Sequence, residues 1–118
     1  MRTNVIVTLQ VEGTDNWPDV IRDHSLKHVQ FLQHSHRHMF HLVCKSYVNH
    51  ADRDKEIINL KQNILAYLKE SWYIESSRLH EFGSSSCEML AQEVLCHFEL
   101  EYCSCLEDNE NGAEVYCE

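Results

Sequence analysis

Residues 34–41 read His34-Ser35-His36-Arg37-His38-Met39-Phe40-His41 and hold the densest cluster of candidate functional side chains in the chain. Successive side chains of a β-strand point to opposite faces of a sheet. His36, His38 and Phe40 therefore share one face, and Leu42 continues that face. This alternation predicts a strand over residues 36–47 that begins with two histidines and continues into apolar residues.

Two imidazoles on one strand face supply half of the ligands that a zinc ion needs, and His34 lies on the same face. The best candidate for a third ligand is Asp15, in the turn expected after an earlier strand, because pairing of the two strands would bring it beside His36 and His38. The spacing also fits a polar, solvated strand face. Spacing alone therefore leaves both interpretations open.

Alternating patterns predict three further strands, over residues 4–12, 102–107 and 113–117. Helical spacing of apolar residues predicts one helix over residues 55–69 and a second that opens at the capping box Ser85-x-x-Glu88. The resulting order is β-β-α-α-β-β. It predicts a single α+β domain over residues 1–118, with an antiparallel sheet and two helices on one face.

The connections between these elements carry weaker signals. The apolar residues within 19–34 follow neither helical nor strand spacing, which predicts a long loop with a short helix near residues 20–26. Residues 72–84 predict a second loop. Asn111-Gly112 is a strong signal for a hairpin turn between the last two strands. A sheet of this kind keeps open edges, which favour pairing with another subunit.

The charge balance excludes one class of partner. The chain has 19 acidic and 10 basic residues and a formal net charge of −9, so it lacks the positive surface that a nucleic-acid polymer requires. No apolar run is long enough to span a membrane. Residues 1–5 enter an alternating pattern without the apolar segment of a secretion signal, so we expect a cytoplasmic protein whose six cysteines are reduced thiols.

The order of motifs resembles one known family. His36-Arg37-His38-Met39-Phe40 is similar to the His-Gly-His-Ser-Phe motif of 6-pyruvoyltetrahydropterin and 6-carboxytetrahydropterin synthases, which have the tunnelling fold, or T-fold. Four other segments match family motifs in the same order: the first strand end at residues 11–15, a helix start at 56–61, a helix cap at 85–88 and a strand end at 106–108. The shared order, rather than any one motif, supports the resemblance.

The resemblance implies a ring in which subunits join their sheets edge to edge, as a tetramer or hexamer, with a ligand pocket between them. Glu107 would hold the amino-pyrimidinone edge of a pterin, guanine or deazaguanine through two parallel hydrogen bonds. Ser86 and Cys87, in the matched helix cap, would contact the same small heterocycle or nucleotide. The wall opposite Glu107 would hold zinc through Asp15, His36 and His38.

Three departures from the family pattern leave the reaction open. Asp15 stands where the family has a zinc histidine, and residues 31–35 lack the family's catalytic cysteine. The family's catalytic histidine segment has no clear counterpart, which leaves His34 or His80 as the candidate base.

Two functions follow from this pattern. One is a zinc-dependent lyase or synthase that acts on pterin or deazapurine precursors. The other is a non-catalytic protein that sequesters or senses a purine-type signalling nucleotide, such as a small phage-encoded sponge. A structural oligomer with a vestigial pocket is a third interpretation.

Overall fold

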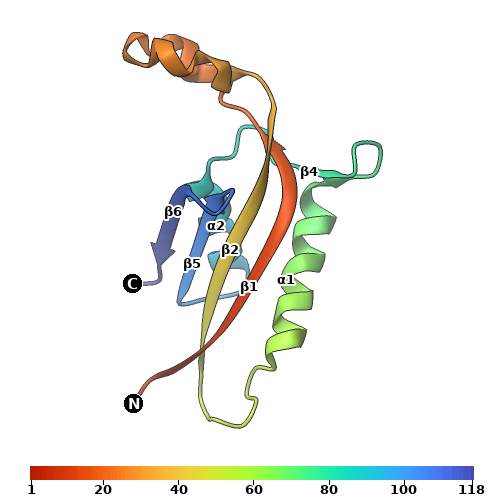
Figure 1. Cartoon of the computed structure of the whole chain (residues 1–118). Coiled ribbons are helices and arrows are strands. Elements are labelled where there is room, and N and C mark those ends of the chain that lie inside the picture. Colours follow the sequence, from red (N-terminus) through yellow and green to blue (C-terminus); the bar gives the residue numbers. More distant parts are fainter.

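Two long strands form the centre of the sheet in the computed structural model, which describes residues 1–118. Strand β1 (Thr3–Asp15) pairs antiparallel with β2 (His36–Val48) along its whole length (Figure 1). The register places Leu9 opposite Leu42 and Asp15 opposite His36. Both strands were predicted from their alternation, and β1 continues three residues beyond the predicted end, so that Asp15 is the last residue of the strand rather than part of a turn.

The complete sheet has six strands in the order β3-β4-β1-β2-β5-β6. Strands β5 (Tyr102–Glu107) and β6 (Asn111–Tyr116) form the predicted C-terminal hairpin beside β2. The predicted loop at residues 72–84 instead contains two short strands, β3 (Tyr73–Ile74) and β4 (Leu79–Glu81). Because β4 pairs parallel with β1, the sheet is mixed rather than purely antiparallel.

Helices α1 (Ile57–Trp72) and α2 (Cys87–His97) cover one face of the sheet, as predicted (Figure 1). One buried cluster joins both helices to the inward side chains of the central strands, and it includes Leu9, Leu42, Cys105, Ile64 and Val94. Burial of such side chains is the main favourable term in folding. The whole chain is therefore organised around a single core.

The cap of α2 lies one residue later than predicted. Ser86, not Ser85, is the N-cap, and its hydroxyl accepts a hydrogen bond from the Met89 amide at 3.2 Å. Glu88 therefore sits in the first turn of α2 and is not the reciprocal partner of a capping box. The sequence signal was ambiguous because residues 84–86 are all serine, and any of them could have served as the cap.

The turn of the C-terminal hairpin also differs from the prediction. Asp108 and Asn109 adopt left-handed backbone conformations, with φ angles of 54° and 58°, which aspartate and asparagine tolerate better than most residues. Asn111 already lies in β6, opposite Glu107. Gly112 is needed for a different reason, since a Cβ atom there would collide with the Cys105 carbonyl oxygen.

The connection between β1 and β2 projects beyond the end of the sheet (Figure 1). It contains two stretches of 3₁₀ helix, η1 (Pro18–Arg22) and η2 (His24–Gln33), where a loop with one short helix was predicted. A hydrogen bond from the Trp17 amide to the Leu32 carbonyl, at 2.6 Å, closes its base. No helix of the structure has both the length and the apolar character needed to cross a membrane.

Candidate metal centre and adjoining pocket

Three adjacent strands bring four potential metal ligands together. The β1–β2 register places Asp15 opposite His36, and His38 follows two residues along the same face of β2. Glu107 comes from β5, where it pairs with Phe40 and so continues that face. One ligand atom from each of the four side chains lies within 4.8 Å of the others. We call these four residues the metal group.

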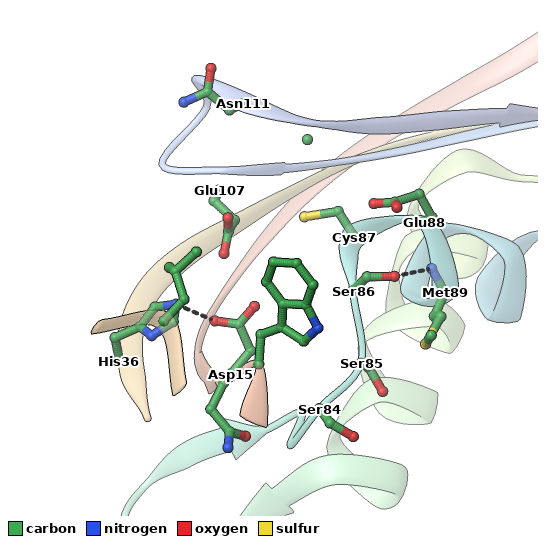
Figure 2. A pocket seen from close by; sticks show the side chains of 14 residues that line it. Asp15, His36, Ser84, Ser85, Ser86, Cys87, Glu88, Met89, Glu107 and Asn111 are labelled. Atoms are coloured by element: carbon green, nitrogen blue, oxygen red, sulfur yellow. Dashed lines mark hydrogen bonds and ion pairs between the residues drawn. The ribbon is translucent and has the colours of Figure 1, made fainter. Parts of the chain in front are cut away.

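The protonation of His36 follows from its contacts. Its Nδ1 atom lies 2.8 Å from the His34 carbonyl oxygen, and a carbonyl can only accept, so Nδ1 must carry a proton. In the neutral ring Nε2 then presents a lone pair, and this atom lies 3.0 Å from Asp15 Oδ1 (Figure 2). That carboxylate oxygen is buried and has no hydrogen-bond donor. Two facing acceptors at this distance require a shared proton or a shared cation between them.

The side of the His38 ring that points away from the metal group contacts Asp108. Its Nδ1 atom lies 2.7 Å from Asp108 Oδ2, while its Nε2 atom faces Glu107 Oε2 at 3.4 Å. Burial lowers the pKa of His38, but the hydrogen bond to Asp108 and the charges of Glu107 and Asp108 outweigh that effect and raise the pKa above its ordinary value of 6.5. At metal sites, the histidine nitrogen that does not bind the metal commonly donates a hydrogen bond to a carboxylate.

Glu107 lies beside the histidines rather than on the wall opposite them, which corrects the predicted arrangement. The side chain is held there because β5 pairs directly with β2. Burial raises the pKa of Glu107, and the nearby carboxyl group of Asp15, which is close enough to share a proton, raises it further. Two carboxylates that compete for one proton provide a favourable place for a divalent cation.

The floor of the metal group is aromatic and tightly packed. Phe40 is fully buried and contacts the His38 ring edge to face, with ring centroids 6.1 Å apart. Phe82 packs against Phe40 at 4.8 Å. Gly13, opposite His38, makes room for this ring, because a Cβ atom there would lie 2.6 Å from Phe82 Cε2 and 2.7 Å from the His80 carbonyl oxygen.

A pocket of about 370 Å³ opens beside the metal group. In Figure 2, Asp15, His36 and Glu107 lie on one side of it, and residues 84–89 lie on the other. The remaining lining residues come from both ends of the β1–β2 connection and from the β5–β6 hairpin: Asn16, Trp17, Leu32, Asn111 and Gly112. The volume is in the lower part of the range of small-molecule sites, roughly 300–1,000 Å³.

The predicted site residues fall into two sets. Ser86 and Cys87 line the pocket together with Glu107, Asp15 and His36. The two candidate bases do not line it.

His34 is exposed and contributes its carbonyl group to His36. The ring of His80 packs against Tyr73 and Phe82, and its Nδ1 atom lies 3.1 Å from the Glu12 carbonyl. Burial lowers the pKa of His80, so this histidine is a half-buried packing residue in the structure.

The residues at this site that the sequence did not predict include Asp108, the partner of His38, and Trp17 and Glu88 in the pocket lining. Asp108 follows the strand predicted over residues 102–107, and its contact with His38 depends on the left-handed backbone of the turn. Glu88 was predicted only as the partner in a capping box. Neither a protein-family model nor a curated protein sequence matches this chain.

Proposed function

We propose that the chain is a zinc-binding protein of the T-fold type whose pocket holds a pterin- or purine-type heterocycle. Asp15, His36 and His38 are the metal ligands in this proposal. Glu107 faces the remaining coordination position and the pocket. Zinc sites that act on small molecules use three protein ligands and leave one position open.

The orientation of the two histidines is the observation that carries the proposal. Each ring has its Nδ1 atom against a protein oxygen, the His34 carbonyl in one case and the Asp108 carboxylate in the other. Each therefore directs Nε2 toward the carboxylates of the metal group. Outer hydrogen bonds of this kind fix both the tautomer and the ring position of metal-binding histidines.

The donor set fits zinc. Imidazole nitrogen and carboxylate oxygen are both ordinary zinc ligands, and the orphaned, buried Oδ1 atom of Asp15 lacks the partner that a cation would supply. Zinc bound here would polarise a carbonyl or hydroxyl group of the ligand. The protein's own residues orient that ligand: Glu107 accepts hydrogen bonds from its N–H edge, and Trp17 offers an aromatic surface.

Metal analysis of protein purified without a histidine tag tests the metal site. We expect about one zinc per chain, lost in His38→Ala and retained in the control His24→Ala, which changes an exposed histidine of η2. Glu107→Gln should keep the zinc but lose binding of pterin or guanosine. Loss of zinc in Glu107→Gln would instead make Glu107 a metal ligand, and absence of zinc from the unmodified protein would exclude the proposal.

Sheet edges support the oligomeric part of the proposal. Strand β6 has six residues and β3 only two, and each pairs with a neighbour on one side alone. Open edges are commonly protected by pairing with another chain. We therefore propose a homo-oligomeric ring, and light scattering that gives the mass of one chain would exclude it. The six free cysteines are in keeping with a cytoplasmic protein.

A second candidate function is sequestration without turnover. It is favoured by the pocket lining, in which His36 is the only histidine. Its Nδ1 atom faces the His34 carbonyl and its Nε2 atom faces Asp15, so no free imidazole is available as a base. In this case the purine-type ligand should co-purify with the protein and be recovered unchanged, as mass spectrometry of the released ligand would show. Formation of a new product from a pterin or deazapurine precursor would favour the enzyme.

A further inference from the structure

We infer that the pocket selects a heterocycle without phosphate groups, that is, a free base or nucleoside rather than a nucleotide. The inference rests on the proposed function and deepens it, because it names the charge class of the ligand. Its basis is the set of charged groups around the pocket, together with the Ser86 cap and the Glu88 carboxylate at the N-terminus of α2.

The lining of the pocket is acidic. Asp15, Glu88 and Glu107 contribute three carboxylates, and no lysine or arginine is among the 14 lining residues. A zinc ion adds two positive charges, so three carboxylates still leave the metal-loaded pocket with one net negative charge. Asp108, hydrogen-bonded to His38 behind the metal group, adds another. A di- or triphosphate would meet repulsion from this lining, and the chain itself offers no basic side chain there to balance it.

The N-terminus of α2 does not compensate for this charge. Helix N-termini attract anions through their free amide groups and the helix dipole. Here the Met89 amide, one of the first three amides of α2, is already bonded to the Ser86 hydroxyl. Glu88, in the first turn, places a carboxylate at the same helix end. The Glu88 side chain forms no hydrogen bond or ion pair within the chain, and the residue lines the pocket (Figure 2).

The remaining lining suits an uncharged planar ring. The indole of Trp17 lines the pocket and is 43% exposed, so part of its surface is available for stacking. The backbone of Trp17 is fixed by its bond to Leu32. The carboxylates of Glu88 and Glu107 accept hydrogen bonds but cannot donate them when ionised. A ring rich in N–H donors therefore matches the chemistry of this pocket.

Calorimetric titration of the zinc-loaded protein with guanosine, GMP and GTP, at about 0.15 M salt, tests the inference. These probes share one base and differ in phosphate content. We expect affinity to fall with each added phosphate, with guanosine at least about tenfold tighter than GTP, since each phosphate brings charge toward the carboxylates. Pterin, titrated in parallel, should bind like guanosine.

A substitution that removes the charge of Glu88 but keeps the size of its side chain isolates its effect from that of the rest of the pocket. Glu88→Gln should improve GTP binding by roughly fivefold, the size of one screened charge–charge contact, and should change guanosine binding less. The matched control is Glu75→Gln, which makes the same change in net charge at an exposed residue outside the pocket lining. It should leave both affinities unchanged.

The possible failures are distinguishable. GTP that binds as tightly as guanosine, or more tightly, would overturn the inference, make the α2 N-terminus a phosphate site and leave the heterocycle pocket standing. Equal effects of Glu88→Gln and Glu75→Gln would also overturn it, by removing Glu88 as the selecting residue. Absence of binding by guanosine, GTP and pterin alike would overturn both the inference and the ligand class of the proposed function.

Discussion

The side chains of His38 and Asp108 meet across the sheet although 70 positions separate them in the chain, with Nδ1 and Oδ2 2.7 Å apart. The other carboxylate oxygen of Asp108 accepts a hydrogen bond from the Met39 amide at 2.9 Å. The two oxygens of one carboxylate therefore have two roles: one anchors the hairpin turn to β2, and the other orients the His38 ring.

Replacing this carboxylate by an amide should weaken metal binding without unfolding the protein. Asn tolerates the left-handed backbone of residue 108, so Asp108→Asn keeps the turn but loses the charge behind His38. We expect zinc affinity to fall roughly 10- to 100-fold, measured by competition with a chromophoric chelator. Asp52→Asn, at an exposed loop position, is the matched control. Unchanged affinity in Asp108→Asn would mean that Asp108 does not position a metal ligand.

Zinc binding should release protons near neutral pH. The pKa of His38 in the metal-free protein is raised above 6.5, so a proton on this ring competes with the metal up to that raised value. Affinity should increase as pH rises from 6.5 through the raised pKa and level off above it. Titrations at pH 7 in two buffers of different ionisation enthalpy would give the number of protons released, and identical heats would count against His38 as a ligand.

The same raised pKa predicts the opposite trend for stability of the metal-free protein. A histidine whose pKa is higher in the folded state than in the unfolded chain stabilises the fold below pH 6.5, and this contribution is lost as pH rises through the folded value. Urea unfolding of the metal-free protein should therefore show a decrease in stability across that window. His38→Gln, which cannot titrate, should remove this part of the pH dependence.

Gly13 should tolerate no side chain. In Gly13→Ala the added methyl group would press on Phe82 and on the His80 carbonyl, and overpacking of this kind costs about 1–3 kcal/mol. Urea unfolding of the metal-free protein would measure the loss. Gly83→Ala is a useful comparison, because its Cβ meets open space and only its φ of 64° is unfavourable. A smaller loss at Gly13 than at Gly83 would contradict the packing described for the floor of the site.

Thiol reactivity should divide the cysteines into two classes. Cys96 and Cys117 are exposed, and the other four are buried. Hydrogen bonding to Cys44 and burial raise the pKa of Cys103 far above its ordinary range, and contact with Cys87 does the same for Cys105. A chromogenic disulfide reagent should therefore label two thiols rapidly in the native protein and all six in denaturant. Rapid labelling of Cys44, Cys103 or Cys105, mapped by mass spectrometry, would show that the core opens readily.

The sequence predicted the parts of this molecule that depend on local periodicity. The alternation in β1 and β2 is long enough to identify both strands and to place His36 and His38 on one face. Strands β3 and β4 have two and three residues, too few for an alternating pattern to be distinguished from a loop. They exist because β1 and α1 offer them partners, and that information is not local.

The composition of the site was predicted better than its arrangement. Asp15, His36 and His38 were grouped correctly because two neighbouring strands pair in a simple hairpin. The position of Glu107 depends on the register between β2 and β5, which are separated by both helices, and no local signal sets that register. The family-based expectation placed Glu107 on the opposite wall, whereas direct pairing with Phe40 puts it beside the histidines.

The metal group draws its members from distant parts of the chain, and this affects the order in which the site can form during synthesis. The β1–β2 hairpin, which carries Asp15, His36 and His38, can pair as soon as residues 1–48 have left the ribosome. Glu107 and Asp108 emerge much later, and β5 must then pair with a strand whose contacts, such as Cys44 with Cys103, span 59 positions. With zinc bound as proposed, a nascent chain would hold the ion only loosely until that last hairpin docks. Tight and selective loading would thus be delayed until translation is nearly finished.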